Sequence, residues 1–349
     1  MSRTRFGVVG CGGAAVPVCE ALSTSPSAVL SKVCDLNADL ARDLGQRLSV
    51  PHGDQLGDIL GDPEVDVVYI AVPHDQLYLL ARQTLEAGKH ALVEKPMVLT
   101  LAQADELIAL AEQRQLALGV FYELRHTRPH AQARELIRAG AIGDIIGIRI
   151  QTLIDKPASY WQFGYSGRAA SSWRGQWARA GGGVVLMNAS HQFDAVYYLT
   201  GLEVVSVSAE VGTLVADVEV EDVAAATLRY HNGAIGNLFA GAHFAGACPG
   251  RDECFDVFGT QGQLKVPDPY GEGALEVHLR QPWGELPANV WHTLPTAPVS
   301  VYAEAVEAFA QAMQRGEPPP TNGRDARRVL SVVLAIYQAA AEKRTITIQ

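Results

Sequence analysis

Apolar residues in the first third of the chain follow two periodicities. Short β-branched and apolar runs occupy residues 5–10, 29–34, 65–72, 90–95 and 116–121. Between them lie segments whose apolar residues recur every three or four positions, as in amphipathic helices. Strands that alternate with helices are typical of βαβ units, so this part predicts a parallel sheet covered by helices.

Two of these helices are expected at residues 75–87 and 100–113. Thr100 and Gln103 form a capping box at the start of the second helix. A further helix is expected from Pro129 to Gly140, because proline suits the first turn of a helix and glycine suits the position just past its end. This helix is predicted to join two domains.

The pattern changes after this helix to strands in succession. We expect strands at residues 145–153, 204–211, 223–230, 234–243, 254–258 and 275–279, and helices at 184–199, 301–314 and 325–343. Tight turns such as HNGA and TQGQ join several of the strands, which favours a mostly antiparallel sheet. The predicted organisation is a Rossmann domain at 1–124 and an α+β domain at 125–349, whose closing helices could pack back on the first domain.

Composition narrows the possible partners. The chain has 349 residues, 48% hydrophobic and 19% charged, which suits two globular domains. Its formal charge is -10 and no Lys/Arg cluster is present, so nucleic acid is an unexpected partner. The five cysteines form no CxxC pair, which argues against a disulfide framework or a zinc site. With no apolar leader or membrane span, we expect a cytoplasmic protein.

A glycine-rich turn follows the first strand. Gly10, Gly12 and Ala15 form GxGxxA, with Cys11, Gly13 and Ala14 between them. This spacing allows a tight turn and lets a pyrophosphate approach the backbone closely. The amino terminus of the following helix can then bind the phosphates.

Asp35 closes the next strand, where a carboxylate could accept hydrogen bonds from the adenosine ribose; an ordinary turn residue is the alternative. Leu36 and Asn37 supply no arginine for a 2′-phosphate, so NAD is preferred to NADP.

Two later strand ends carry further candidates, because ligands bind at the carboxyl edge of such sheets. The third strand ends in Ala71, Val72, Pro73 and His74, and His74 could either line the cofactor or cap the next helix. The fourth ends in Glu94, Lys95 and Pro96. Lys95 could exchange a proton with an alcohol or ketone while NAD exchanges the hydride, although a lone lysine is usually exposed. Pro96 could follow a cis peptide bond.

Several motifs together resemble the glucose-fructose oxidoreductase/inositol dehydrogenase/MocA family. They are GCGGAA, EAGKHALVEKP, Arg125 followed by Pro129, GGGVVLMNASHQFD and FAQAMQRGEPP, in the expected order over nearly the whole chain. The resemblance implies a Rossmann domain, an open-faced sheet domain, a substrate bound between them, and a dimer or tetramer formed through the sheet. Members are mostly NAD(P)-dependent dehydrogenases or reductases of sugars, inositols and related cyclic polyols. Lys95 and His191 match the family's catalytic lysine and histidine.

The chain departs from the family pattern at two positions. Met187 stands four residues before His191, where relatives commonly carry an aspartate, and a thioether cannot replace a carboxylate. Asn188 could do so only if the helical turn distorts, since one residue turns the helix by about 100°. Asp194 could orient the imidazole or be a packing residue. Leu77 replaces a common histidine.

Substrate contacts are expected from the aromatic and arginine-rich connection at residues 156–179. Its candidates are Tyr160, Trp161, Trp173 and Arg174, with Tyr165, Arg168 and Trp177 nearby; Tyr122 and Arg125 are added by their place in the resemblance, and Asn188 and His191 complete the set. Aromatic faces can cover a sugar ring while arginine and tyrosine bind its hydroxyls. Alternatively, the connection is held by its own aromatics or buried against another subunit.

These observations predict an NAD(P)-dependent oxidoreductase that acts on a sugar, inositol or cyclic polyol, with Lys95 as acid/base assisted by His191. Two alternatives remain. The protein could retain NAD and use transient oxidation for glycoside elimination or cleavage, or it could sense a dinucleotide and sugar without turnover.

Overall fold

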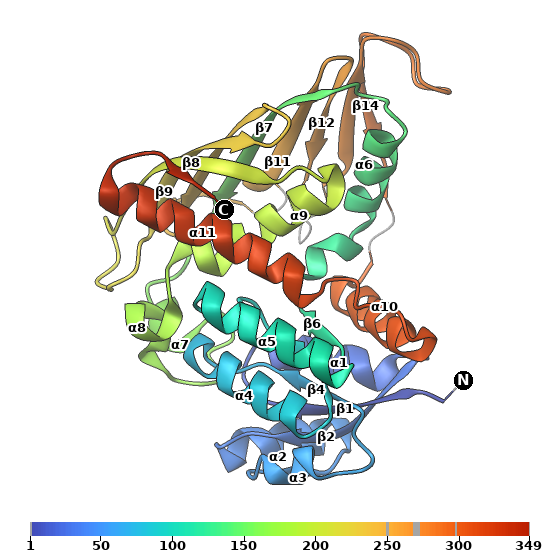
Figure 1. Cartoon of the computed structure of the whole chain (residues 1–349), viewed down its shortest axis with the longest axis vertical. Helices are drawn as coiled ribbons and strands as arrows, with labels where there is room; N and C mark the ends of the chain where they lie inside the picture. Colours follow the sequence, from blue (N-terminus) through green and yellow to red (C-terminus); the bar gives the residue numbers. More distant parts are fainter. Residues whose placement is uncertain (1, 249–250, 268–272, 297–298, 349) are drawn as a thin grey trace. The chain divides into compact units, whose positions relative to one another are not determined.

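The computed structural model describes residues 2–248, 251–267, 273–296 and 299–348 (Figure 1). Its internal contacts divide the chain into two units. The first unit comprises residues 1–123, 159–181 and 300–330, and the second comprises 124–158, 182–299 and 331–349. The chain therefore returns to the first unit twice, once through the aromatic connection and once near its carboxyl end. The division at 124/125 stays a prediction of domain organisation.

The first unit contains a six-stranded parallel sheet in the order β3-β2-β1-β4-β5-β6. Its strands are β1 (Thr4–Val9), β2 (Ala28–Cys34), β3 (His52–Gly53), β4 (Val67–Ile70), β5 (His90–Val93) and β6 (Leu118–Val120). The strand order reverses between β1 and β4, which is the switch point where doubly wound sheets bind ligands. The predicted parallel sheet is confirmed.

Helices connect these strands, and segments from later in the chain join them. The helical segments of this unit are α1 (Ala15–Thr24), α2 (Ala38–Leu48), α3 (Gly57–Leu60), α4 (His74–Glu86), α5 (Leu101–Arg114), α7 (Tyr160–Phe163), η2 (Ser172–Gly175), α8 (Trp177–Ala180) and α10 (Val301–Arg315). The Thr100 hydroxyl accepts a hydrogen bond from the Gln103 amide, as the predicted capping box requires. Phe309 of α10 lies in the core beside Phe6, with ring centroids 5.9 Å apart. The first closing helix thus packs on this sheet.

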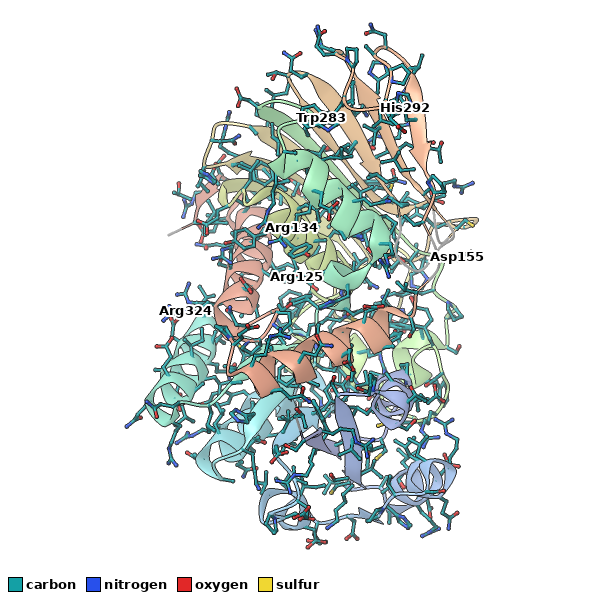
Figure 2. The ribbon with its side chains drawn as sticks, turned by 90° about the vertical axis from the view of Figure 1, so that its right-hand side faces the viewer. Arg125, Arg134, Asp155, Trp283, His292 and Arg324 are labelled. Atoms are coloured by element: carbon teal, nitrogen blue, oxygen red, sulfur yellow. The ribbon has the colours of Figure 1, made fainter. Side chains whose placement is uncertain are left out.

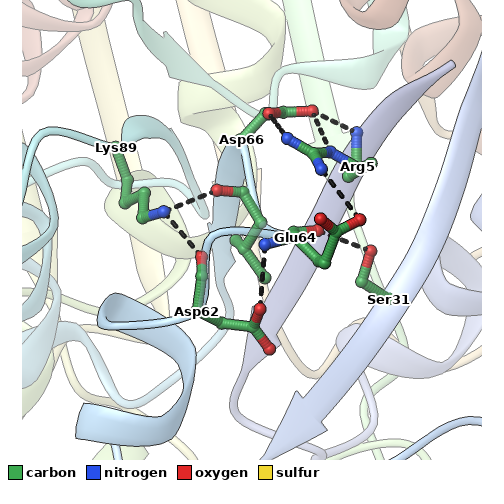
Figure 3. Close-up of polar contacts among 7 residues, drawn as sticks. Arg5, Ser31, Asp62, Glu64, Asp66 and Lys89 are labelled. Carbon is green, nitrogen blue, oxygen red and sulfur yellow. Dashed lines mark hydrogen bonds and ion pairs between the residues drawn. The ribbon is translucent and has the colours of Figure 1, made fainter. Parts of the chain in front are cut away.

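A polar cluster lies at the amino ends of β1 and β4 (Figure 3). The Arg5 guanidinium donates to both carboxylate oxygens of Asp66, at 2.9 and 2.6 Å, and forms an ion pair with Glu64. Arg5 lowers the pKa of the Asp66 carboxyl. Lys89 donates to the carbonyls of Asp62 and Val65. These contacts tie strand starts together at the edge opposite the ligand-binding edge.

The second unit contains a nine-stranded sheet in the order β14-β13-β12-β11-β7-β10-β9-β8-β15. Its strands are β7 (Ile145–Leu153), β8 (Val204–Gly212), β9 (Val223–Tyr230), β10 (Ile235–Gly241), β11 (Glu253–Gly259), β12 (Gly262–Val266), β13 (Leu275–Leu279), β14 (Trp291–Leu294) and β15 (Ile346–Thr347). Only β7 and β10 pair in parallel among these strands. The expected mostly antiparallel sheet is confirmed.

One face of this sheet is covered by helices and the other is open. The helical segments are η1 (Glu123–His126), α6 (Arg128–Arg138), η3 (Val185–Ala189) and α9 (Ser190–Thr200), and α11 (Gly323–Glu342) enters the unit after Leu330. The strand burial pattern alternates, with β9 and β10 burying every second residue. That alternation leaves Ile235 and Phe239 exposed on the open face.

Candidate active site

The glycine-rich turn has the space that a dinucleotide requires. Gly10 has φ +94°, and a Cβ there would lie 2.1 Å from the Ala71 carbonyl oxygen, so this glycine serves the close packing of β1 against β4. A Cβ on Gly12 would meet no protein atom within 4 Å. Helix α1 follows, and no side chain caps its amino terminus. Open space beside an uncapped helix start fits a bound pyrophosphate.

Asp35 is bonded to the same turn. Its carboxylate accepts a hydrogen bond from the Cys11 amide at 2.7 Å and one from the Asn37 amide at 2.8 Å. Each carboxylate oxygen has two lone pairs, so these bonds leave capacity for ribose hydroxyls. Asp35 therefore holds the turn in shape, and its ribose contact stays a prediction.

His74 begins α4 directly after Ala71, Val72 and Pro73. Its Nδ1 lies 2.8 Å from the Ala180 carbonyl oxygen, and its ring centroid lies 4.4 Å from that of Trp173. Burial lowers the pKa of His74 to about 3, so the imidazole is neutral. It does not cap α4 through its side chain. Instead, it anchors the connection segment to the carboxyl end of β4.

The EKP motif closes β5 with a partly buried acid beside the candidate catalytic lysine. The Lys95–Pro96 bond is cis. The Glu94 carboxylate accepts a hydrogen bond from the Tyr69 hydroxyl at 2.5 Å and another from the Lys95 amide at 3.1 Å. Burial raises the pKa of Glu94 to about 7, against the opposing charge of Lys95. Glu94 is thus bonded on both sides and holds the backbone at Lys95.

The aromatic connection is held together by its own side chains. Tyr160 lies against Trp161 and Tyr165, with ring centroids 5.4 and 4.7 Å apart. The Arg174 guanidinium lies 5.6 Å from the Tyr160 ring centroid and 4.8 Å from that of Trp173. The connection is therefore held together by its own aromatic side chains, which is the alternative that the sequence left open. Its aromatic and arginine side chains belong to the first unit with the glycine-rich turn, and their substrate contacts stay predictions.

The Gly181–Gly183 segment positions the helix that carries His191. A Cβ on Gly182 would lie 2.0 Å from the Tyr337 hydroxyl, and one on Gly183 would lie 1.8 Å from the Glu221 carbonyl oxygen. The Glu221 carboxylate accepts hydrogen bonds from the amides of Gly183 and Val185 and from Tyr337. Burial raises the pKa of Glu221. This carboxylate binds the start of the helical segment, where a negative group is favourable.

The turn before His191 is a π-helix, a correction to the regular helix expected over 184–199. It spans Val185–Ala189, and α9 begins only at Ser190. Such single wide turns occur often at functional sites. Met187 is buried, and the Asn188 side-chain oxygen accepts a hydrogen bond from Lys156 Nζ at 2.7 Å. The helical turn at Asn188 is therefore distorted, and Asn188 binds a buried lysine; its replacement of a carboxylate stays a prediction.

Arg125 and Asp194 form a buried ion pair. Arg125 Nε donates to Asp194 Oδ2 at 2.8 Å, and its Nη2 donates to Oδ1 at 2.6 Å. The Arg125 and Arg134 guanidiniums lie 5.3 and 4.0 Å from the ring centroid of Tyr198. Figure 2 labels these two arginines, which come from η1 and α6. Arg125 therefore joins η1 to α9, and its substrate contact, like that of the buried Tyr122, stays a prediction.

Sequence reasoning did not single out Lys156 or Glu221. Lys156 is 2% exposed, and its carbonyl oxygen lies 3.0 Å from His243 Nδ1. Both residues lie far along the chain from the partners they bind, and no spacing rule connects them. The DKP sequence at 155–157 was the one local signal, since it shortly follows a predicted strand and resembles EKP.

No helix among the described residues has the length and apolarity to cross a membrane. Likewise, no group of three or more His, Cys, Asp or Glu side chains in the described ranges could hold a metal ion.

Comparison with protein families identifies both halves of the chain. Residues 4–122 match the model of an oxidoreductase family with an NAD-binding Rossmann fold, and residues 130–265 match the GFO/IDH/MocA C-terminal domain. The chain belongs to the Gfo/Idh/MocA family. The predicted resemblance is confirmed, and the protein is an NAD-binding oxidoreductase.

Three members of this family or fold are similar over nearly the full length of the chain. The 1,5-anhydro-D-fructose reductase of Ensifer adhaerens is 28% identical over 97% of this chain and 96% of its own. The myo-inositol 2-dehydrogenase of Thermotoga maritima is 25% identical over 99% and 98%. A levoglucosan dehydrogenase crystallised with NADH and levoglucosan covers both chains fully, with a TM-score of 0.88 at 23% identity. The last comparison supports the fold.

Proposed function

We propose that this family member transfers hydride between NAD and a hydroxyl or ketone of a sugar, inositol or related cyclic polyol. The observation that carries the proposal is Lys95, which follows a buried strand of an NAD-binding domain with its backbone bonded to Glu94. Relatives of similar length reduce an anhydrosugar or oxidise an inositol by name, which supports this substrate class.

In the proposed oxidation, the Lys95 amine accepts the proton of the substrate hydroxyl. Bound NAD⁺ supplies the hydride acceptor, so the carbon loses a hydride and the oxygen loses a proton to give a carbonyl. In the reverse direction, the Lys95 ammonium returns the proton to the carbonyl oxygen. His191 is proposed to bind the same substrate oxygen or its neighbour. Tyr160, Trp161, Trp173 and Arg174 are proposed to contact the ring.

Two substitutions of Lys95 test its role. Lys95→Ala should lower kcat by about a hundredfold or more, as expected when a general acid/base is lost. Lys95→Arg keeps the positive charge, but its guanidinium does not lose a proton in proteins, so it should be similarly slow. NADH binding, measured by fluorescence, should persist in both variants. A Lys95→Arg variant with most of its turnover would contradict the proton-transfer role.

Asp35 is proposed to favour NAD over NADP. Its carboxylate lies at the end of β2 and repels a 2′-phosphate, while Leu36 and Asn37 carry no positive charge. Asp35→Ala should bring the affinities for NADH and NADPH closer together. An unchanged ratio, with the fold intact by circular dichroism, would reject the ribose role.

A second candidate function is favoured by Met187. The resemblance implies an aspartate where this chain carries the Met187 thioether, which favours a protein that binds dinucleotide and sugar as a sensor. Elimination or cleavage with retained NAD is the other alternative. Measuring NADH together with the product separates these two alternatives from net oxidation of a substrate. NADH accumulates in proportion to the product in a dehydrogenase, stays at or below one per enzyme in a retained-NAD reaction, and does not form in a sensor.

We also propose that the open face of the nine-stranded sheet binds a second copy of the chain. Across four strands this face carries Arg149, Asp256, Lys265 and Glu276 in register, with alternating charge. If a second copy faces this sheet across a twofold axis parallel to the strands, its row of charges runs in the opposite direction. Each charge then meets an opposite charge, and Arg149 lies opposite Glu276 of the second copy. The same twofold axis brings Ile235 opposite Trp291 of the second copy. These two side chains are about half exposed and lie at the two ends of a second row of paired residues, beside the row of charges.

Light scattering with charge reversal tests this assembly. Arg149→Glu or Glu276→Arg should weaken the dimer, and the double reversal should restore it because the opposite charges again face one another. If both single variants keep the parent's mass at every concentration, the open face does not bind a second copy.

A further inference from the structure

A short segment of the aromatic connection crosses the glycine-rich turn. We call residues Gly164 to Arg168 the strap. It follows α7, and both Gly164 and Gly167 have φ +64°, so the backbone bends sharply at each end. The strap and the turn both belong to the first unit although about 150 residues separate them in the chain. It therefore needs specific contacts to stay in place.

Arg168 ties the strap to two elements around the turn. Its Nε donates to the Cys11 carbonyl oxygen at 2.8 Å, and its Nη2 donates to the Leu40 carbonyl oxygen at 3.1 Å. Its Nη1 forms an ion pair with Asp43 at 2.5 Å. The Arg168 side chain is 17% exposed, whereas Asp43 is 60% exposed. The guanidinium thus bridges the turn and α2 with three donors.

Ser166 lies directly on the turn. A Cβ built on Gly13 would come within 2.3 Å of Ser166 Oγ, a distance that real side chains do not tolerate. Gly13 therefore lacks a side chain because the strap occupies that position. The neighbouring Gly12, by contrast, meets no protein atom, and the space beside it is where a pyrophosphate approaches. Ser166 Oγ also accepts a hydrogen bond from the Arg168 amide at 3.3 Å, which leaves the hydroxyl hydrogen to donate.

We propose that the strap is a clasp for the bound dinucleotide: Ser166 donates a hydrogen bond to the pyrophosphate, and Arg168 is the latch that holds the strap over it. NAD can leave only after the three Arg168 contacts open or the strap bends away. The clasp therefore sets the rate of cofactor release. This inference concerns cofactor binding and does not depend on which substrate is oxidised.

Stopped-flow fluorescence of NADH tests the clasp in the full-length protein without any sugar. Preformed complex is mixed with excess NAD⁺, and the loss of bound NADH signal gives its dissociation rate constant. Arg168→Ala should raise this constant by about tenfold or more, as expected when charge-assisted hydrogen bonds are lost. Asp43→Asn, which removes one of the three contacts, should raise it by a smaller factor. Ser166→Ala should raise it with Arg168 intact.

Arg42→Ala is the matched control. Arg42 also lies on α2 and pairs with an aspartate, Asp39, but it is 54% exposed and makes no contact with the strap among those described. Its NADH dissociation rate should equal that of the parent. If Arg168→Ala and Ser166→Ala release NADH within twofold of the parent rate, the clasp is refuted. If Arg168→Ala fails to fold, Asp43→Asn and Ser166→Ala decide the question alone.

Discussion

Replacing Glu94 with glutamine should change how the stability of the protein depends on pH. Glu94 has its pKa raised from 4.5 to about 7, chiefly because burial disfavours its charge. Glutamine has the same shape and cannot ionise, and its side-chain oxygen can still accept the Tyr69 hydrogen bond. One partner is lost, because the glutamine NH₂ cannot accept from the Lys95 amide.

The size and sign of the effect follow from linkage. Between pH 4.5 and 7, Glu94 is protonated in the folded protein and ionised in the unfolded chain, so unfolding releases a proton and stability falls as the pH rises. The rise in the Glu94 pKa, from 4.5 to about 7, corresponds to about 3 kcal/mol at ~1.36 kcal/mol per pKa unit. The parent loses this stability above pH 7, whereas Glu94→Gln does not. The lost Lys95 bond costs the variant about 1 kcal/mol at every pH.

Urea denaturation of parent and variant at pH 5 and pH 8 measures this difference. The free energy of unfolding of Glu94→Gln, relative to the parent, should rise by about 2.5 kcal/mol between the two pH values, because a small part of the change already occurs below pH 5. Glu106→Gln is the control, because Glu106 also accepts a tyrosine hydroxyl, that of Tyr78, but is 48% exposed. Its relative stability should change by less than about 0.5 kcal/mol. A Glu94→Gln difference that is equal at both pH values would refute a raised Glu94 pKa in the folded protein.

Three further substitutions follow from the packing around the sites. Gly12→Ala should leave the melting temperature of the NAD-free protein unchanged, because its Cβ meets no protein atom, and should weaken NADH binding at least tenfold if the space beside it holds the pyrophosphate. Gly183→Ala should instead destabilise the protein by about 2 kcal/mol or more, because its Cβ would overlap the Glu221 carbonyl, and unchanged thermal unfolding would contradict this. Arg125→Ala should cost about 3–5 kcal/mol in denaturant unfolding because it leaves the Asp194 carboxylate buried without its ion pair, and a cost below about 1 kcal/mol would show that the pair is solvated.

The sequence predicts the first sheet well because its signals are local. Each strand is a compact apolar run, Thr100 caps its helix as expected, and Pro129 lies in the first turn of the helix that begins at Arg128. The short strand β3 (His52–Gly53) and β15 (Ile346–Thr347) were missed because two residues carry no periodicity. The return of residues 159–181 to the first unit was also missed. It depends on Arg168 and Ser166 meeting partners far away in the chain, which no local pattern encodes.

In the candidate site, too, local features could be predicted and long-range contacts could not. Lys95 and the glycine-rich turn follow from motif and strand position, and the cis bond before Pro96 is confirmed. The π-helical turn could not be predicted, because VVLMNAS is equally compatible with a regular helix. The partner of Asp194 could not be predicted either, since helical spacing offered His191, whereas the structure shows bonds from Arg125.

The glycines show why a motif alone does not identify the function of each residue. Gly10, Gly12 and Gly13 lie together in one turn, yet their missing side chains serve three purposes. Gly10 admits the Ala71 carbonyl, Gly13 admits Ser166, and only Gly12 faces space that no protein atom fills. A GxGxxA spacing with two glycines explained by protein contacts is therefore evidence for a fold, and only at Gly12 does the open space agree with the place of a pyrophosphate. Gly12→Ala and Gly13→Ala consequently test different claims: the first tests the pyrophosphate site, and the second tests whether the strap lies over it.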